Sequence, residues 1–325
     1  MPRAVFAEAF GPPESYALRE LSRRELQPGE VRVTLKAAGI SFVDVLTAAG
    51  QYQVKPPLPF CPGSEAAGAV AELGEGVTGF AIGDGVVCSN WGGLFADEVV
   101  LPAAKLDPIP AGLSFIEAAV FPVSYATAWY ALKDRGQVRP GEAVLVLGAG
   151  GATGFAAVEV ARHLGARVIA SASNPDKRAL ALAGGADAVV EARAGDWREQ
   201  VRAANGGKPV DVVFDPVGGE ATDPAFRSLG WGGRHLIVGF PGGIAALRTN
   251  LPLLKGASLV GVDIRQFGLH EPERAQANRA SVFALGGQGA FKPAIARAYP
   301  LEQFAAAMTE AAAGTSAGRI VLTMD

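Results

Sequence analysis

The pattern of apolar and polar positions changes once along the chain. Before about residue 120, short apolar runs alternate with Gly and Pro, as at Val31 to Ala37, Glu65 to Glu72 and Asp84 to Cys88. Short runs bounded by turn-forming residues are typical of β-strands. This part of the chain therefore predicts a β-rich, barrel-like unit.

From Glu142 onward, apolar strands alternate with Ala-rich helical segments. The run AVLVL is followed by the turn GAGGATG, the helical segment FAAVEVARHL and the strand ARVIASAS. Four further strand-like segments follow, which are DAVVE, DVVFD, RHLIVGF and SLVGVDI. Repeated strand and helix segments of this kind predict an α/β domain, with six strands in a doubly wound parallel sheet of the Rossmann type.

The last part of the chain predicts a helix from Leu301 to Ala313, ended by Gly314, and a strand from Arg319 to Thr323. We expect these elements to rejoin the first domain. The expected boundaries are therefore 1–124 completed by 266–325 for the β-rich domain, and 125–265 for the Rossmann domain.

Composition narrows the functional classes. The 325 residues carry a net charge of −3 without a run of like charges, which argues against a nucleic-acid partner. No apolar stretch reaches the roughly 18 residues of a membrane helix, and the first residues lack a secretory signal, so we expect a cytoplasmic protein without a membrane partner. Cys61 and Cys88 form neither a CxxC pair nor a disulfide framework, and we expect free thiols.

The glycine-rich turn indicates a dinucleotide site. It runs from Gly148 to Gly154 between a strand and a helix, and it includes Gly151, Ala152 and Thr153. Glycines permit a tight turn and let backbone amides approach a pyrophosphate at the positive end of the helix. Such a turn alone is often only a turn, but a second strand beyond the helix favours dinucleotide binding.

The next strand ends without the carboxylate that would hold an NAD ribose. The segment reads Ser171-Ala-Ser-Asn174, and Lys177 and Arg178 follow in the first turn of the next helix. The Ser173 hydroxyl and these two cations suit a 2′-phosphate, so NADPH is expected rather than NADH. The alternative is that Lys177 and Arg178 only solvate a helix face.

Several segments together resemble the zinc-free medium-chain dehydrogenase/reductases, in the quinone oxidoreductase or zeta-crystallin-like branch. They are Ala38-Gly-Ile-Ser-Phe-Val-Asp44, Gly50-Gln-Tyr52, Pro59-Phe-Cys-Pro-Gly-Ser-Glu65, Asp215-Pro-Val-Gly218, Trp231-Gly-Gly-Arg234, Val238-Gly-Phe240 and Gly318-Arg-Ile-Val-Leu322. The resemblance implies a GroES-like catalytic domain beside the Rossmann domain, with nicotinamide held between them. It also implies a homodimer joined through the cofactor sheets, for which the edge strand is Ser258 to Ile264, a run that could equally be an ordinary buried strand.

The resemblance also bears on zinc. Zinc-dependent relatives have Cys where this chain has Ser41 and His where it has Ser64. The chain also lacks four clustered cysteines, and its three histidines are far apart in the sequence. We therefore expect no metal, which leaves reduction of an electron-poor acceptor more feasible than alcohol oxidation.

The resemblance assigns roles to individual residues. Ser41, Tyr52 and Thr127 would line the nicotinamide and the substrate, although Ser41 could instead cap a short helix with Asp44 as its partner. Tyr52 could equally be packing.

Further cofactor contacts are expected from the second half of the chain. Val217 and Phe240, at carboxyl ends of strands, would flank the nicotinamide ribose, and the alternative is that both only pack in the core. Family members commonly have Asn at Ser41 and Tyr at Ala192, and Arg193 is a candidate to replace the missing phosphate contact, or a solvated loop charge.

These features predict an enzyme that transfers hydride from NADPH to a quinone or enone. The same scaffold could reduce an enoyl thioester or another activated alkene. A different class of function is an NADPH-binding protein with little catalysis, as in the crystallin relatives. A zinc alcohol dehydrogenase is a poorer third interpretation.

Overall fold

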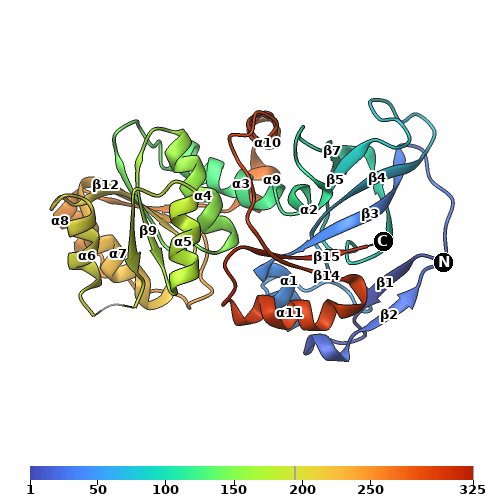
Figure 1. Ribbon diagram of the computed structural model, residues 1–325, viewed down its shortest axis with the longest axis horizontal. Helices are drawn as coiled ribbons and strands as arrows, with labels where there is room; N and C mark the ends of the chain where they lie inside the picture. Colours follow the sequence, from blue (N-terminus) through green and yellow to red (C-terminus); the bar gives the residue numbers. More distant parts are fainter. Residues whose placement is uncertain (194, 325) are drawn as a thin grey trace. The chain divides into compact units, whose positions relative to one another are not determined.

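The computed structural model describes residues 1–193 and 195–324. The chain forms two compact units (Figure 1). The first unit contains Met1–Pro122 and the residues from Ile295 onward, and the second contains Val123–Ala294. Among the described residues, no helix is both long and apolar enough to cross a membrane.

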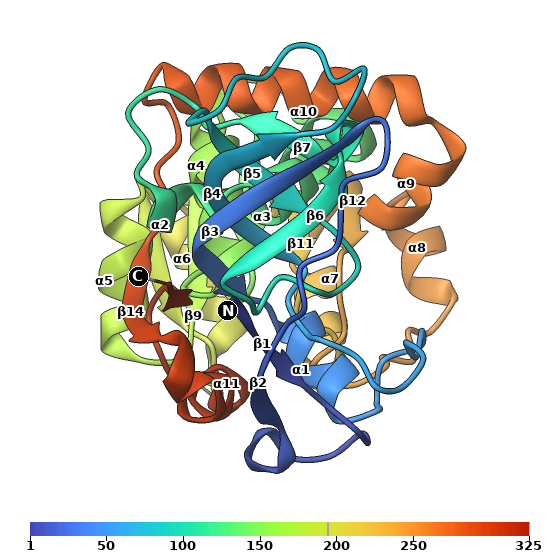
Figure 2. The same ribbon diagram turned by 90° about the vertical axis from the view of Figure 1, so that its right-hand side faces the viewer.

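The first unit is built on a seven-stranded sheet. Its order is β14-β15-β3-β4-β5-β7, with β6 pairing with β3, and Figure 2 shows β3 beside β4 and β6. All pairs are antiparallel except β14 with β15. The bounds are β3 Glu30–Ile40, β4 Glu65–Leu73, β5 Gly85–Ser89, β6 Glu98–Pro102, β7 Leu106–Pro108, β14 Ile295–Pro300 and β15 Arg319–Thr323.

A hairpin and three short helices complete this unit. Its core contains Val33, Leu35, Val86, Leu94 and Phe95, none of which is exposed. Gly314, with a left-handed φ of 61°, ends the last helix where the sequence predicts. The remaining elements are β1 Arg3–Phe6, β2 Ala17–Glu20, α1 Phe42–Ala48, α2 Phe115–Ala118 and α11 Phe304–Ala313.

The second unit contains the predicted doubly wound sheet. Its six strands are parallel and have the order β10-β9-β8-β11-β12-β13. They are β8 Ala143–Val146, β9 Arg167–Ala172, β10 Ala188–Glu191, β11 Val210–Asp215, β12 Leu229–Ile237 and β13 Ser258–Gly261. All four residues of β8 are buried, as expected for a central strand covered by helices on both faces. The strand order reverses between β8 and β11, and ligands of such sheets bind at the carboxyl ends of the strands next to this point.

Helices connect the strands of this sheet. Figure 1 shows α4 and α5 beside β9. The helices are α3 Pro122–Trp129, which continues as a π-helix to Arg135, α4 Ala152–His163, α5 Pro175–Ala183, α6 Trp197–Ala204, α7 Thr222–Arg227, α8 Asn250–Lys255, α9 Ile264–His270 and α10 Pro272–Gly287.

The segment 266–294 was expected in the first domain but packs with the second unit. The Phe267 ring stacks on Tyr130 with centroids 3.9 Å apart. The Asn278 side chain donates a hydrogen bond to Asp134 over 2.7 Å. These contacts join α9 and α10 to the segment that follows α3.

The predicted strand from Ser258 to Ile264 is shorter than expected. Strand β13 ends at Gly261, and α9 begins at Ile264 because the Asp263 carboxylate accepts hydrogen bonds from two amides of its first turn. The strand lies at the sheet edge, and Leu259 is 44% exposed. It is therefore an exposed edge strand and not a buried one.

Candidate active site

The glycine-rich turn joins β8 to α4 and brings backbone atoms close together. Gly148 has a φ of 57°, and Gly151 caps the helix in an extended conformation. A Cβ atom on Gly154 would lie 2.2 Å from the Gly148 carbonyl oxygen, so only glycine permits this approach. The first-turn amides at Ala152 and Thr153 have no partner within the helix and favour an anion there.

Lys177 lies directly beside this turn. A Cβ atom on Gly150 would lie 2.3 Å from the Cβ of Lys177, and Lys177 is only 9% exposed. Its burial lowers the pKa of the ammonium group. Lys177 therefore packs against the turn and does not lie on a solvated helix face.

The other predicted phosphate-binding residues surround the end of β9. Ser173 is exposed directly after the strand, and Asn174 caps α5 by accepting a hydrogen bond from the Lys177 amide over 2.8 Å. Arg178 donates to the Ala172 carbonyl over 3.3 Å. Arg193 is exposed two residues after β10, which is paired with β9.

Asp215, at the end of β11, organises the turn that contains Val217. One carboxylate oxygen accepts hydrogen bonds from the Val217 and Gly218 amides, over 2.9 and 2.8 Å. The other accepts one from the Thr222 hydroxyl over 2.8 Å and lies 2.9 Å from His235 Nε2. Burial alone would raise the pKa of Asp215, but these hydrogen bonds lower it.

The sequence analysis did not identify this buried network. His235 is fully buried, and Asp215 is 1% exposed. The sequence analysis singled out the segment that begins with Asp215 but not its partner. His235 lies 20 residues later on another strand, so no local motif contains both residues.

The turn after β11 meets both the glycine-rich turn and the loop that contains Phe240. A Cβ atom on Gly148 would come within 3.0 Å of a Val217 methyl group. The Val217 carbonyl accepts a hydrogen bond from the Gly242 amide over 2.8 Å. Phe240 itself is 56% exposed. The structure thus gathers the predicted pyrophosphate and ribose contacts at one edge of the sheet.

Thr127 lies on α3, in the same unit as the nucleotide contacts, and is 7% exposed. Its hydroxyl donates a hydrogen bond to the Val123 carbonyl over 2.6 Å. The hydroxyl proton is therefore already used, and in this arrangement Thr127 can only accept a hydrogen bond from another group.

Ser41 and Tyr52 belong to the first unit and lie near the two ends of α1. Ser41 caps this helix, and its hydroxyl donates to Asp44 Oδ2 over 2.6 Å. The predicted capping box is therefore present. Ser64 also donates to Asp44 Oδ2, over 3.3 Å, and its Oγ lies 3.5 Å from Ser41 Oγ.

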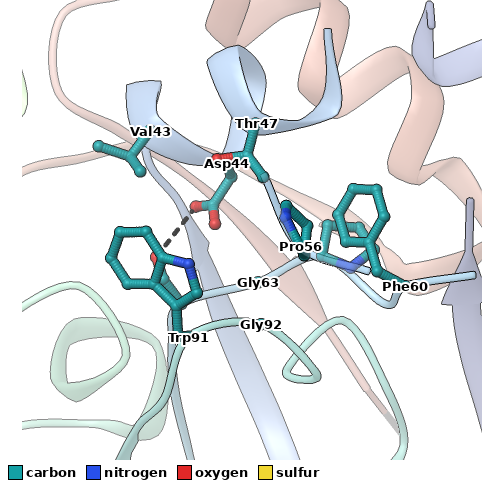
Figure 3. Close-up of a pocket in the computed structure, with 10 residues that line it drawn as sticks. Val43, Asp44, Thr47, Pro56, Phe60, Gly63, Trp91 and Gly92 are labelled. Atoms are coloured by element: carbon teal, nitrogen blue, oxygen red, sulfur yellow. Dashed lines mark hydrogen bonds between the residues drawn. The ribbon is translucent and has the colours of Figure 1, made fainter. Parts of the chain in front are cut away.

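A small pocket opens beside this polar cluster (Figure 3). It has a cavity volume of about 20 Å³, and Asp44, Ser64 and Trp91 are among the residues that line it. The Tyr52 ring packs 5.7 Å from the Trp91 ring. Sequence reasoning treated Asp44 only as a cap and did not identify Trp91, which carries no recognisable motif.

Cys61 and Cys88 are free, and burial raises the pKa of each thiol to about 12. Within residues 1–193 and 195–324, no three His, Cys, Asp or Glu side chains gather into a group that could hold a metal ion.

Both units match known protein families. Residues 27–111 match the alcohol dehydrogenase GroES-like domain, and residues 152–279 match the zinc-binding dehydrogenase family. Quinone oxidoreductase-like protein 2 of Mus musculus is 36% identical over 309 residues, which cover 94% of this chain and 88% of that protein. The Bos taurus protein of the same name is 38% identical, with the same coverage.

Solved structures share the whole architecture. An NAD-dependent alcohol dehydrogenase is 32% identical with a TM-score of 0.91, covering 99% of this chain and all of that one. The quinone oxidoreductase of Thermus thermophilus, solved also in complex with NADPH, is 30% identical with a TM-score of 0.86 and the same coverage. The CurK enoyl reductase is 25% identical with a TM-score of 0.89, covering 100% of this chain and 99% of that one. The chain therefore belongs to the medium-chain dehydrogenase/reductase family, in its quinone oxidoreductase branch, and is an oxidoreductase with a GroES-like domain and a Rossmann domain.

Proposed function

We propose that the chain uses NADPH, without zinc, to reduce a quinone or a similar conjugated carbonyl compound. The observation that carries the choice of cofactor is the position of Lys177. The stem of this lysine packs on the glycine-rich turn, Ser173 is exposed directly after β9, and the end of β9 carries no carboxylate. A 2′-phosphate would meet a cation there, whereas an NAD ribose would lack its usual acidic partner.

The residues of the second unit fit a dinucleotide. A side chain on Gly154 would fill the turn, and the first-turn amides at Ala152 and Thr153 would donate hydrogen bonds to a pyrophosphate. The turn held by Asp215 would place Val217 beside the nicotinamide ribose. When bound, NADPH supplies the hydride.

The residues of the first unit suit a neutral, conjugated acceptor. Ser41 and Ser64 offer hydroxyl groups, and Tyr52 and Trp91 offer aromatic faces. Hydride addition to a conjugated carbon moves negative charge onto the acceptor oxygen, where a hydroxyl donor stabilises it. This chemistry needs no Lewis acid, which agrees with serine at both positions where zinc-dependent relatives have Cys and His.

The test is turnover with a panel of acceptors. Purified protein is mixed with NADPH or NADH and a simple quinone, an enone or an enoyl thioester, and the loss of reduced-nicotinamide absorbance is followed. An alcohol is tested with NADP⁺ or NAD⁺, and the gain of that absorbance is followed. Rapid oxidation of NADPH with the quinone is expected, with slower oxidation of NADH. Turnover of alcohol with NADP⁺ that is lost with a chelator would refute the proposal.

The second candidate is reduction of an enoyl thioester, favoured by the structural similarity to an enoyl reductase. In the same assay, a preference for the thioester over the quinone would select this function. Tight NADPH binding without turnover of any acceptor would instead indicate a binding protein.

We also propose a homodimer formed through β13. This edge strand is exposed, and Trp231, Leu253 and Leu254 are 83%, 78% and 68% exposed on neighbouring elements of the same unit. Exposed apolar side chains beside an open strand edge favour pairing with a second copy. Light scattering should give twice the chain mass, and Leu259→Lys should give monomers. A monomeric parent protein would refute the dimer.

A further inference from the structure

Asp44 is a buried carboxyl group at the wall of a pocket, and two serine hydroxyl groups lie beside it. It is 5% exposed, and it lines the pocket together with Ser64. Its Oδ2 atom lies 2.6 Å from Ser41 Oγ and 3.3 Å from Ser64 Oγ. The two serine hydroxyls are 3.5 Å apart, and either can donate to the other.

Burial favours the neutral form of Asp44, whereas its hydrogen bonds and the nearby cation favour the ionised form. Arg319 is the cation that acts on Asp44, and it already forms a buried ion pair with Glu65. Asp44 shares this cation with Glu65, so burial of its ionised form remains costly. Burial also raises the pKa of the Asp44 carboxyl group, although the Ser41 and Ser64 hydrogen bonds and Arg319 oppose this effect.

The contacts allow a proton to move from Asp44 to the pocket. When Asp44 is protonated, Oδ2–H donates to Ser41 Oγ across the 2.6 Å contact. The Ser41 hydroxyl then turns to Ser64 Oγ, and the Ser64 hydroxyl points into the pocket that it lines. A volume of about 20 Å³ admits one water or one acceptor oxygen, not an entire ring.

We infer that Asp44 stores the proton consumed by the reduction and delivers it through Ser41 and Ser64 to the acceptor oxygen. This inference rests on the proposed function. Ser64 is then the catalytic residue, because it touches the reacting oxygen, and Asp44 acts through the two serines.

The proton and electron balance is complete. Hydride from NADPH forms a C–H bond on the acceptor, and the resulting oxyanion takes the proton of Ser64. Ser64 regains a proton from Ser41, and Ser41 regains one from Asp44. The Asp44 carboxylate then takes a proton from solvent, so that NADPH, one proton and the acceptor give NADP⁺ and the reduced acceptor.

The first measurement uses the protein without any acceptor. Infrared difference spectra between the parent protein and Asp44→Asn at neutral pH should contain the C=O stretching band of a protonated carboxyl group. Ser64→Ala should retain this band. Asp84→Asn is the matched control, because Asp84 is an exposed carboxylate of the same unit that accepts a backbone hydrogen bond over 2.7 Å. A parent protein without the band would overturn the inference, whatever its activity.

The second measurement is steady-state turnover with the quinone. General acid catalysis typically contributes about 100-fold or more, so Asp44→Asn and Ser64→Ala should each lower kcat by about 100-fold. The KM for NADPH should change less than about twofold, since that cofactor contacts other residues, and Asp84→Asn should match the parent. The solvent deuterium isotope effect on kcat should change in Asp44→Asn. The Asp44→Asn variant is expected to fold, because Asn can still accept the hydrogen bond from the Ser41 amide. Near-ultraviolet circular dichroism checks this.

The outcomes separate the two proposals. If the band is present but Asp44→Asn turns over like the parent, the relay is wrong and the proposed function stands. If the parent fails to oxidise NADPH with any of the acceptors, the proposed function fails and the relay has no reaction to serve. The infrared band still reports the protonation of Asp44 in that case.

Discussion

Glu159 provides a direct test of how burial changes the energetics of the second unit. It lies on α4, accepts a hydrogen bond from the Tyr125 hydroxyl, and accepts weaker ones from the Lys292 amide over 3.3 and 3.4 Å. Burial is the largest influence and raises the pKa of Glu159 from 4.5 to about 7, although these hydrogen bonds oppose it. Glu159→Gln removes the ionisation and keeps an oxygen that can accept the Tyr125 hydrogen bond.

The raised pKa determines the sign of the effect. The folded protein holds the Glu159 proton up to about pH 7, whereas the unfolded chain releases it near pH 4.5. Between these values the folded state binds more protons, so its stability decreases as pH rises. At 1.36 kcal/mol per pKa unit, the difference between 4.5 and about 7 means that ionisation of Glu159 lowers the free energy of unfolding by at most about 3 kcal/mol.

The assay is thermal unfolding of the parent and of Glu159→Gln at about pH 5 and about pH 8, the two sides of the ionisation. At the higher pH the variant avoids the buried charge, and its Tm should exceed that of the parent by up to roughly 6–12 °C, from about 2–4 °C per kcal/mol. At the lower pH this gain should shrink to a small part of that value, because the parent is then largely protonated.

A matched substitution separates this effect from general changes in charge. Glu199 is an exposed residue of α6 in the same unit, so Glu199→Gln should shift Tm by similar small amounts at both pH values. If Glu159→Gln also changes Tm equally at both pH values, the buried carboxyl does not ionise in this range, and the reasoning is wrong.

Two further predictions concern the cofactor. Lys177→Ala should weaken NADPH binding by about tenfold, near 1.4 kcal/mol for one charge-assisted contact, with a smaller effect on NADH; fluorescence titration would show equal weakening if Lys177 does not meet the 2′-phosphate. Gly154→Ala should abolish binding of both cofactors, because its Cβ would lie 2.2 Å from the Gly148 carbonyl oxygen. The nearest contact of a Cβ on Gly151 is at 3.4 Å, so Gly151→Ala should bind both cofactors more tightly than Gly154→Ala does. Equal titrations for the two variants would place the pyrophosphate elsewhere.

Local sequence patterns predict the sheet of the second unit well because its strands are continuous apolar runs. Strand β8 is buried at every position, and the alternation with helices limits such strands to a parallel sheet. The strand from Arg319 to Thr323 is confirmed with its predicted bounds, because an apolar run follows a helix that ends at glycine.

The segment 266–294 could not be assigned in this way, because tertiary contacts determine where it packs. Apolar and polar residues are mixed along α10, and its buried residues are Val282 and Gly286, so its own pattern does not identify a partner. Phe291 stacks on Tyr125 with centroids 5.3 Å apart, although the two residues are more than a hundred positions apart. No periodic signal within one element predicts such a pair.

The contact between His235 and Asp215 depends on the register of two neighbouring strands, which the prediction of the site would have required. In the parallel pair of β11 and β12, His235 is the partner of Val213. Val213 and Asp215 are two residues apart and therefore face the same side of the sheet, which places His235 diagonally beside the Asp215 carboxylate. A shift of one residue in this pairing would turn His235 to the other side and remove a hydrogen bond to the group that holds the Val217 turn. The glycine-rich turn can be predicted from a few adjacent residues, but the positioning of the second turn depends on strand register, which the sequence pattern alone does not specify.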